Sequence, residues 1–237
     1  DEVRPGSLLA KPEKLGARIF SSTAGRVKEL TDSAVVIEES GEQPEDFVKI
    51  EPEDEELLSF VRAAGVVGMG GAGFPTDVKL KLDLKNGYVL VNAAECEPLL
   101  AHNMKQIMEQ CEKTLRGVEY CMKITHAPQA VIAIKAKHKR EIEELKKYLP
   151  EHPGIGIHLL PDLYPMGEER AVVREVLGKL LPPTALPSAA DAVVINVETV
   201  LRVAEAIEDR RPVFTKNLTV AGKLKRGTES QVFQDVP

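Results

Sequence analysis

The decisive part of the sequence is the stretch Val67-Gly68-Met69-Gly70-Gly71-Ala72-Gly73-Phe74-Pro75-Thr76-Asp77-Val78-Lys79. Four of residues 68–73 are glycine, which lets the backbone adopt positive φ angles and lie directly against a ligand. A run of small side chains leaves successive backbone N–H groups uncovered, and such groups can form a concave site for an anion. Pro75 suits the first turn of a helix, and Lys79 adds a positive charge one turn later. The stretch therefore predicts either a phosphate site for a nucleotide or flavin or a flexible glycine turn.

The stretch matches neither of the two common glycine-rich nucleotide motifs. A Rossmann fingerprint follows a strand directly, whereas the preceding residues 53–64 have the apolar spacing of a helix that stops at Gly65. A Walker loop needs Gly-Lys followed by Ser or Thr, and the sequence contains no such triplet. If the stretch binds a phosphate, it does so in another structural context.

The composition indicates a folded, acidic protein. The chain has 237 residues, of which 43% are hydrophobic and 29% are charged, enough for a sizeable core. Its formal net charge of −6 argues against a nucleic-acid partner, because binding to a phosphate backbone needs a basic surface. No apolar run approaches the ~20 residues that a membrane helix needs, and no signal peptide is visible. We therefore expect a cytoplasmic protein without a direct membrane span.

The cysteines and histidines predict neither a disulfide framework nor a metal site. The three cysteines, Cys96, Cys111 and Cys121, include no Cys-x-x-Cys pair, which argues against an iron–sulfur cluster held within this chain. The five histidines are scattered without metal-ligand spacing. Cys96 lies between two glutamates, which disfavour a reactive thiolate, and we interpret it as an unreactive residue.

The chain divides into three parts. Residues 1–49 contain short β-rich runs separated by Gly, Ser and Asp, which predict a small β module. Residues 50–211 alternate between strand-like and helical runs, which predicts an α/β fold with a mostly parallel sheet and helices on both faces. Residues 212–237 return to a β pattern that looks unfinished, and we expect the chain to be a segment of a longer protein. The elements predicted in the middle part are helices at residues 53–64, 102–123, 138–149, 168–177 and 198–207, and strands at residues 88–92, 129–134, 155–160 and 192–196.

Three further stretches carry polar residues where a predicted strand leads into a helix. They are residues 92–98 (Asn-Ala-Ala-Glu-Cys-Glu-Pro), 164–169 (Tyr-Pro-Met-Gly-Glu-Glu) and 196–199 (Asn-Val-Glu-Thr). Ligands of open α/β sheets bind beyond the carboxyl ends of the strands, so these turns are placed for function. Each alone is also explained as a solvated turn with a capping acid. Together with the glycine stretch, they indicate one shared pocket.

The four stretches occur in this order and at similar separations in a known family. They resemble the NADH-binding flavoprotein subunit of respiratory complex I and the C subunit of the Rnf-type electron transport complexes, with their cobalamin-reductase and proline-reductase-associated relatives. The resemblance covers about residues 50–210. Residues 1–49 look like the barrel-sandwich module that precedes this domain in the Rnf-type branch, and residues 212–237 look like the start of the β-grasp (SLBB) module that follows it.

The resemblance implies an FMN cofactor with NADH stacked over the flavin. In this family Glu97 and Glu169 would lie near the nicotinamide and its ribose as the catalytic pair. Acids around the site would repel a 2′-phosphate, which favours NADH over NADPH. The residues implied in cofactor binding are Gly68, Gly70, Gly71, Ala72, Gly73, Phe74, Lys79, Asn92, Glu95, Tyr164, Gly167, Glu168, Asn196 and Thr199.

Two departures from the pattern of the family stand out. Position 94 is alanine, where the complex I branch has an aspartate against the flavin and the Rnf-type branch commonly has a small residue. The cysteine-rich ferredoxin region of both branches is not present, so the iron–sulfur clusters would lie outside this segment. The alanine at position 94 favours the Rnf-type branch.

The resulting functional hypothesis is an electron-transfer flavoprotein module. Its bound FMN would oxidise NADH and pass electrons to an iron–sulfur domain or subunit, alongside other subunits of an electron-transfer complex. The protein would be cytoplasmic, or peripheral to the inner face of the membrane through partner subunits. The alternatives are a non-catalytic scaffold with an empty site and a nucleotide-binding regulatory subunit without a redox role.

Overall fold

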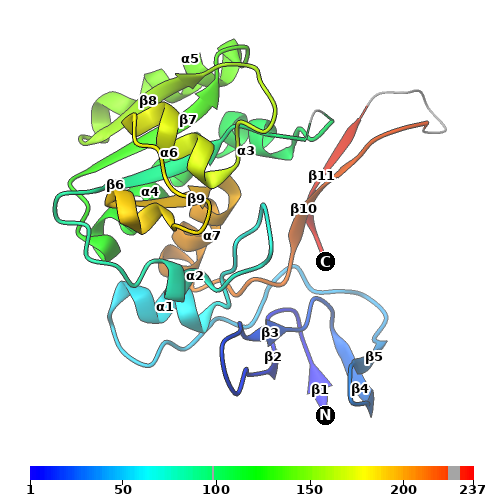
Figure 1. Ribbon diagram of the computed structural model, residues 1–237. Coiled ribbons are helices and arrows are strands. Elements are labelled where there is room, and N and C mark those ends of the chain that lie inside the picture. The colour runs from blue at the N-terminus through cyan, green and yellow to red at the C-terminus, as the bar shows by residue number, and fades with distance from the viewer. Residues whose placement is uncertain (98, 224–229) are drawn as a thin grey trace.

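A four-stranded parallel sheet forms the centre of the protein. The computed structural model describes residues 1–97, 99–223 and 230–237 (Figure 1). The strands are β6 (Tyr88–Ala93), β7 (Gln129–Lys135), β8 (Ile155–Leu160) and β9 (Ala192–Asn196), in the order β8-β7-β6-β9. All three neighbouring pairs are parallel.

Helices cover both faces of this sheet because side chains alternate along each strand. Val89 and Val91 of β6 point into one core with α1 (Leu57–Ala63), α4 (Cys111–Thr125), α5 (Lys139–Tyr148) and α7 (Val197–Glu208). Leu90 between them points into the second core, under α6 (Glu169–Leu177) and the short helix η2 (Pro187–Ala190). An alternation of period two places successive residues on opposite faces of a sheet. The predicted α/β class with helices on both faces is confirmed.

The boundaries differ from the predicted ones at two helices. The predicted helix at residues 102–123 is two helices, α3 (His102–Glu109) and α4, separated at Gln110, whose backbone leaves the helical region at φ −134° and ψ 36°. Gln106 on α3 is fully buried and donates to the Val197 carbonyl, so tertiary contacts direct α3 away from α4. The predicted helix at residues 53–64 starts only at Leu57, after a run of acids.

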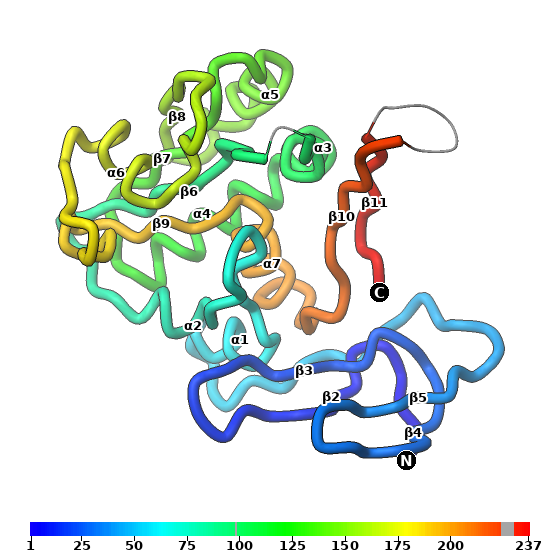
Figure 2. Tube along the Cα trace, turned by 45° about the vertical axis from the view of Figure 1, so that its right-hand side comes forward, coloured from blue at the N-terminus to red at the C-terminus, as the bar shows by residue number. Residues whose placement is uncertain are grey.

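The two ends of the chain form small antiparallel sheets. At the N-terminus, β1 (Glu2–Val3), β4 (Gly25–Leu30) and β5 (Val35–Glu39) form one sheet, and β2 (Leu8–Ala10) pairs with β3 (Ile19–Phe20). At the C-terminus, β10 (Lys216–Val220) pairs with β11 (Gln231–Val236) as a hairpin. Figure 2 shows the β2–β3 pair next to α1 and the hairpin next to α7. Their assignment as barrel-sandwich and SLBB modules, with boundaries at 49 and 212, stays a prediction, and residues 224–229 lie outside the described part.

The Arg211 side chain joins the two ends. Its guanidinium lies 5.3 Å from the ring centre of Phe47 and 5.1 Å from that of Phe214. A guanidinium over an aromatic face is attracted by the ring quadrupole. This contact links the N-terminal part to the segment that enters the C-terminal hairpin.

The sheet has a topological switch point between β6 and β9. The chain moves from β6 outward through β7 to β8, and then returns to the other side of β6 to form β9. Crevices at such points, beyond the carboxyl ends of the strands, are the usual ligand sites of open α/β sheets.

The short helix α2 (Thr76–Lys79) follows the glycine loop, and the 3-10 helix η1 (Leu149–Glu151) precedes β8. Among the described residues, no helix has both the length and the apolar character needed to cross a membrane.

Candidate functional site

A cavity of about 550 Å³ lies beyond the carboxyl ends of β6 and β9. This volume is within the range of about 300–1,000 Å³ that is typical of small-molecule and cofactor sites. The cavity is lined by Gly68, Gly70, Gly71, Ala72, Phe74, Lys79, Asn92, Gly167, Glu168, Glu169, Arg170, Pro183, Thr184, Ala185, Leu186, Pro187, Val194 and Asn196. Each of the four predicted stretches contributes at least one residue to the wall of the cavity. From residues 92–98 this is Asn92, and Pro98 lies outside the described residues.

The glycine loop is closed at its base and open at its tip. The Gly68 N–H donates to the Phe74 carbonyl at 2.9 Å, and the Met69 N–H donates to Thr199 Oγ1 at 2.9 Å. Within the described part of the chain, the N–H groups of residues 70–73 make no hydrogen bond. Residues 70–72 line the cavity, and successive free N–H groups of this kind can form a concavity that binds an anion.

The glycines of the loop differ in their backbone φ angles and in the space available for a side chain. Only Gly73 has a positive φ, at 67°. A Cβ on Gly70 would lie 2.7 Å from Asn196 Nδ2, so Gly70 is required by this close approach. A Cβ on Gly71 would meet no atom within 4 Å, so this position faces open space. The sequence-based expectation of positive φ applies at one position of the four.

Lys79 and Glu169 face each other in the cavity. Lys79 Nζ donates to Glu169 Oε1, and both side chains keep part of their surface exposed. These residues are 90 positions apart, and no local pattern predicted their pairing. The ammonium is therefore partly neutralised, and an anionic ligand in the cavity would compete with Glu169 for it.

Asn92 and Asn196 hold the turns around the cavity. Asn92 Nδ2 donates to the Gly167 carbonyl at 2.8 Å, which ties the end of β6 to the turn before α6. Asn196 Oδ1 accepts from the Glu198 N–H at 2.8 Å and caps α7. A side-chain oxygen at this position satisfies one of the free N–H groups of the first helical turn. Both amides therefore shape the site through the backbone.

Cys96 has a structural contact at the same turn. Its Sγ accepts a hydrogen bond from the Gly167 N–H, and a Cβ on Gly167 would lie 2.7 Å from that sulfur. Gly167 is therefore required by the close packing of the two turns. Cys96 is a free cysteine, like Cys111 and Cys121. In the described ranges 1–97, 99–223 and 230–237, no group of three or more His, Cys, Asp or Glu side chains is arranged to hold a metal ion.

Eleven of the sixteen predicted site residues line the cavity, and five do not; these five are Gly73, Glu95, Glu97, Tyr164 and Thr199. Thr199 supports the glycine loop from behind through Met69. Tyr164 is 77% exposed and lines a neighbouring hollow. Glu97 is exposed on the loop after β6.

Sequence reasoning missed one wall of the cavity. Residues 183–187 follow α6 and contribute backbone and apolar side chains. Arg170 Nη1 donates to the Pro183 carbonyl at 2.6 Å and fixes this wall to the start of α6, while its Nε donates to Glu168 at 2.8 Å. Val194, inside β9, forms part of the floor. None of these residues carries a chemical motif, so only the proline content of residues 182–187 could have drawn attention to the segment.

Glu95 lies in the loop that follows β6 and does not line the cavity. Burial raises the pKa of its carboxyl to about 7, although hydrogen bonds from Asn103 partly oppose this shift. Its Oε2 atom has no hydrogen-bond partner among the described residues. The charged carboxylate is therefore disfavoured in the folded protein.

Replacement of Glu95 should stabilise the protein in a pH-dependent way. The ordinary pKa of 4.5 lies below the folded value of about 7, so the folded state holds the proton more tightly, and this group lowers stability as the pH rises from 4.5 to 7. Glu95→Gln removes that loss. We expect the melting temperature of the variant to exceed that of the wild type clearly at pH 8 and only slightly at pH 5. Glu97→Gln, at the exposed neighbour, is the control for the loss of one carboxylate in this loop. An equal gain of Glu95→Gln at both pH values would contradict the burial of Glu95.

Comparison with known families agrees with this geometry. The family model for the Nuo51 FMN-binding domain matches residues 61–205, which is more than half of the chain. The matched span contains the glycine loop and all three polar turns. The chain belongs to the Nuo51 FMN-binding domain family.

Curated relatives confirm the resemblance to the Rnf-type branch. Cobalamin reductase PduS of Salmonella typhimurium is 46% identical over 172 residues, which cover 73% of this chain and 37% of that protein. The C subunit of the proton-translocating ferredoxin:NAD(+) oxidoreductase complex of Clostridium ljungdahlii is 34% identical over 242 residues, which cover 94% of this chain and 52% of that protein. The chain thus spans between about a third and a half of the length of these relatives.

The fold also occurs in a solved structure. The NAD+-reducing NiFe hydrogenase in its H2-reduced state superposes with a TM-score of 0.64 and 22% identity, over 76% of this chain and 37% of that chain. At this identity the comparison shows a shared fold.

Proposed function

We propose that this chain is the FMN-binding module of a flavoprotein subunit that oxidises NADH and passes electrons to an iron–sulfur acceptor outside the segment. The observation that carries the proposal is the row of free N–H groups at residues 70–73, of which residues 70–72 line a cavity at the switch point of the sheet. Membership in the Nuo51 FMN-binding domain family supports it.

The residues around the cavity fit FMN. Residues 70–72, whose N–H groups are free, and Lys79 line the cavity and suit a phosphate, which accepts charge-assisted hydrogen bonds. Leu186, Pro187 and Val194 provide apolar wall for a flat ring system. Phe74 lines the same cavity. A mostly apolar pocket with a few convergent polar groups is typical of cofactor sites.

The chain would contribute binding and orientation to the reaction. When bound, a flavin supplies hydride acceptance and the release of single electrons. Lys79 and the loop would hold the phosphate, and the walls would exclude water from the ring. Glu169, in the cavity, and Glu97, on the exposed loop after β6, would orient the nicotinamide and ribose of NADH.

The partners that we propose are those suggested by the complexes and reactions of the relatives. The relative from Clostridium ljungdahlii belongs to a ferredoxin:NAD(+) oxidoreductase complex. By analogy, we propose that this chain works with an iron–sulfur domain or subunit and with other subunits of an electron-transfer complex, in the cytoplasm or at the inner face of the membrane. The cobalamin reductase relative makes a corrinoid acceptor the second candidate for the electrons.

The test is reconstitution of the purified protein. We expect FMN to bind with a flavin absorption band, and anaerobic NADH to bleach that band faster than NADPH. Absence of FMN binding would contradict the flavin site. Binding of FMN that dithionite reduces and NADH does not would support the non-catalytic scaffold instead. Binding of a nucleotide without any flavin would support the regulatory alternative.

Lys79→Met should lower the affinity for FMN more than the affinity for riboflavin, which lacks the phosphate. Hydrogen bonds to charged groups contribute about 1.5–3 kcal/mol, so we expect FMN affinity to fall by at least about tenfold. The unpaired Glu169 would then repel the phosphate as well. Titration of both ligands measures the effect, and the double variant Lys79→Met/Glu169→Gln should recover part of the FMN affinity. Equal losses for FMN and riboflavin would show that Lys79 supports the fold and does not contact the phosphate.

A further inference from the structure

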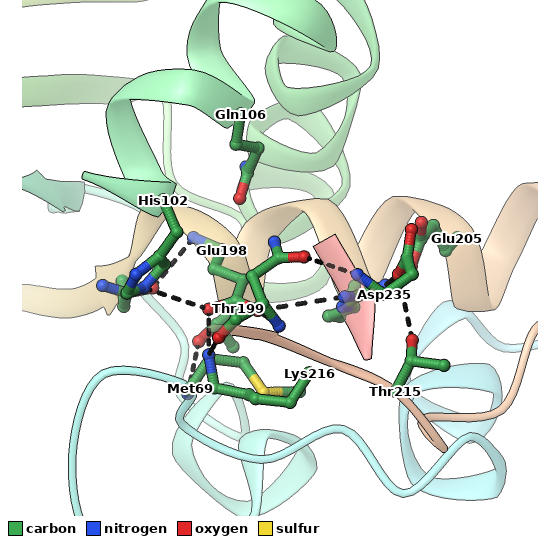
Figure 3. Close-up of polar contacts among 12 residues, drawn as sticks. Met69, His102, Gln106, Glu198, Thr199, Glu205, Thr215, Lys216 and Asp235 are labelled. Atoms are coloured by element: carbon green, nitrogen blue, oxygen red, sulfur yellow. Dashed lines mark hydrogen bonds and ion pairs between the residues drawn. The ribbon is translucent and has the colours of Figure 1, made fainter. Parts of the chain in front are cut away.

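The first turn of α7 contacts two separate parts of the chain. On one side, Thr199 Oγ1 accepts from the Met69 N–H of the glycine loop, and Asn196 lies against Gly70. On the other side, the carboxylate of Glu198 accepts from Lys216 Nζ of the C-terminal hairpin (Figure 3). One helical turn therefore joins the wall of the cavity to the hairpin.

Glu198 is fully buried and its oxygens are used by the hairpin. Its Oε1 atom accepts from the Asn217 N–H at 3.2 Å, and its Oε2 atom lies 3.7 Å from His102 Nε2. His102 in turn contacts Thr219 Oγ1 of β10 at 3.0 Å. A buried carboxylate without its partner is strongly destabilising, so these contacts hold the hairpin and α7 in one arrangement.

A second buried contact fixes the hairpin further along α7. Arg202 is 2% exposed and donates to Asp235 of β11 at 3.0 Å and to Glu205 on its own helix at 2.8 Å. Thr215 Oγ1 also donates to Asp235, at 2.9 Å (Figure 3). The hairpin thus docks on α7 through charged and polar groups from both of its strands. All of its residues lie beyond residue 205, where the match to the family model ends.

We infer that Glu198 is a positioning residue for the cofactor site and couples the docking of the hairpin to the shape of the glycine loop. Glu198 and Thr199 are neighbours on one rigid turn, and the Glu198 N–H is capped by Asn196, which itself touches the loop. A shift of Glu198 therefore moves both loop contacts. The inference rests on the proposed FMN site for its effect on ligand binding, and on the structure alone for its effect on the loop.

The test uses two variants that break the same ion pair from opposite sides, Lys216→Met and Glu198→Gln. Lys216 is in the hairpin, outside the cavity wall, and partly exposed. Its replacement should lower the melting temperature, because the buried Glu198 carboxylate loses its ammonium partner, whereas Glu198→Gln breaks the pair without leaving a buried charge. Glu208→Gln is the matched control, because Glu208 is on the same helix and pairs with Arg116 of α4, away from the hairpin. Thermal melts of all three establish that the variants are folded.

The first readout needs no ligand. Hydrogen exchange of the Met69 N–H, which donates to Thr199, should become faster by about tenfold in both ion-pair variants and stay at the wild-type rate in Glu208→Gln, because the loop loses its fixed support. Unchanged exchange in Lys216→Met and Glu198→Gln would overturn the inference. Since this measurement uses the ligand-free protein, it stands even if FMN does not bind.

The second readout is a double-mutant cycle on FMN affinity. Thr199→Val removes the acceptor of the Met69 N–H directly, and Lys216→Met removes the support of Glu198 behind it. We compare the FMN affinity of the double variant with that of the single variant that binds FMN less tightly. If both substitutions act through the same loop contact, these two affinities should differ by no more than about twofold. Fully additive losses would show that the hairpin does not act through the loop, and would overturn the coupling. FMN binding by the wild type tests the proposed function separately.

Discussion

Gly71→Val should abolish FMN binding and leave the ligand-free protein folded. A Cβ at this position meets no protein atom within 4 Å, and its φ is not in the left-handed region, so the backbone tolerates a side chain there. The open space belongs to the cavity, and the neighbouring N–H groups are the proposed phosphate site. A β-branched side chain would fill the space that the ligand needs and would hold the ligand away from these groups.

The controls separate ligand space from folding. Gly156→Val is matched, because Gly156 also has no atom within 4 Å of an added Cβ but lies in β8 and outside the cavity wall. Gly70→Ala should instead disturb the protein itself, because its Cβ would lie 2.7 Å from Asn196 Nδ2. FMN titration and a thermal melt measure both effects. Wild-type FMN affinity in Gly71→Val would show that the loop is a structural turn.

Glu169→Gln should slow flavin reduction by NADH on the order of 100-fold, the scale of a small misplacement of a reacting group. Glutamine keeps the size of the side chain and can still accept from Lys79, so FMN should bind at least as tightly as in the wild type. Loss of the carboxylate removes the partner proposed for the nicotinamide end of NADH. Stopped-flow traces under anaerobic NADH measure the rate.

Two comparisons give this result its meaning. Reduction by dithionite should be unaffected, because it needs no bound nucleotide. Glu175→Gln is the matched variant, since Glu175 is on the same helix and pairs with Arg174 outside the cavity wall. Reduction of Glu169→Gln at the wild-type rate would leave Glu169 with only its contact to Lys79 and its place in the first turn of α6.

Much of the site could be predicted from the sequence because its signals are local. Each polar turn follows an apolar strand, and parallel strands bring their carboxyl ends to the same edge, so the turns had to meet. The small side chains of the glycine loop are enough to indicate free N–H groups. The same local logic failed for Glu95, which comes two residues after the end of β6 but does not line the cavity and has a φ of 41°. A positive φ at a residue other than glycine depends on packing that the sequence does not display.

By itself, the sequence determined the alternation of strands and helices, the two faces of the sheet and the turns that surround the cavity. These features depend on side-chain periodicity and on capping and turn residues, which act over a few positions. The tertiary structure decided the pairing of Lys79 with Glu169, the need for glycine at position 70, the break at Gln110 and the burial of Glu198 under the hairpin. Each of these features depends on groups that are distant along the chain and that come into contact only in the folded protein. Their energies depend on the path of the backbone, because a charge or a close contact acts only on what lies within a few ångströms of it.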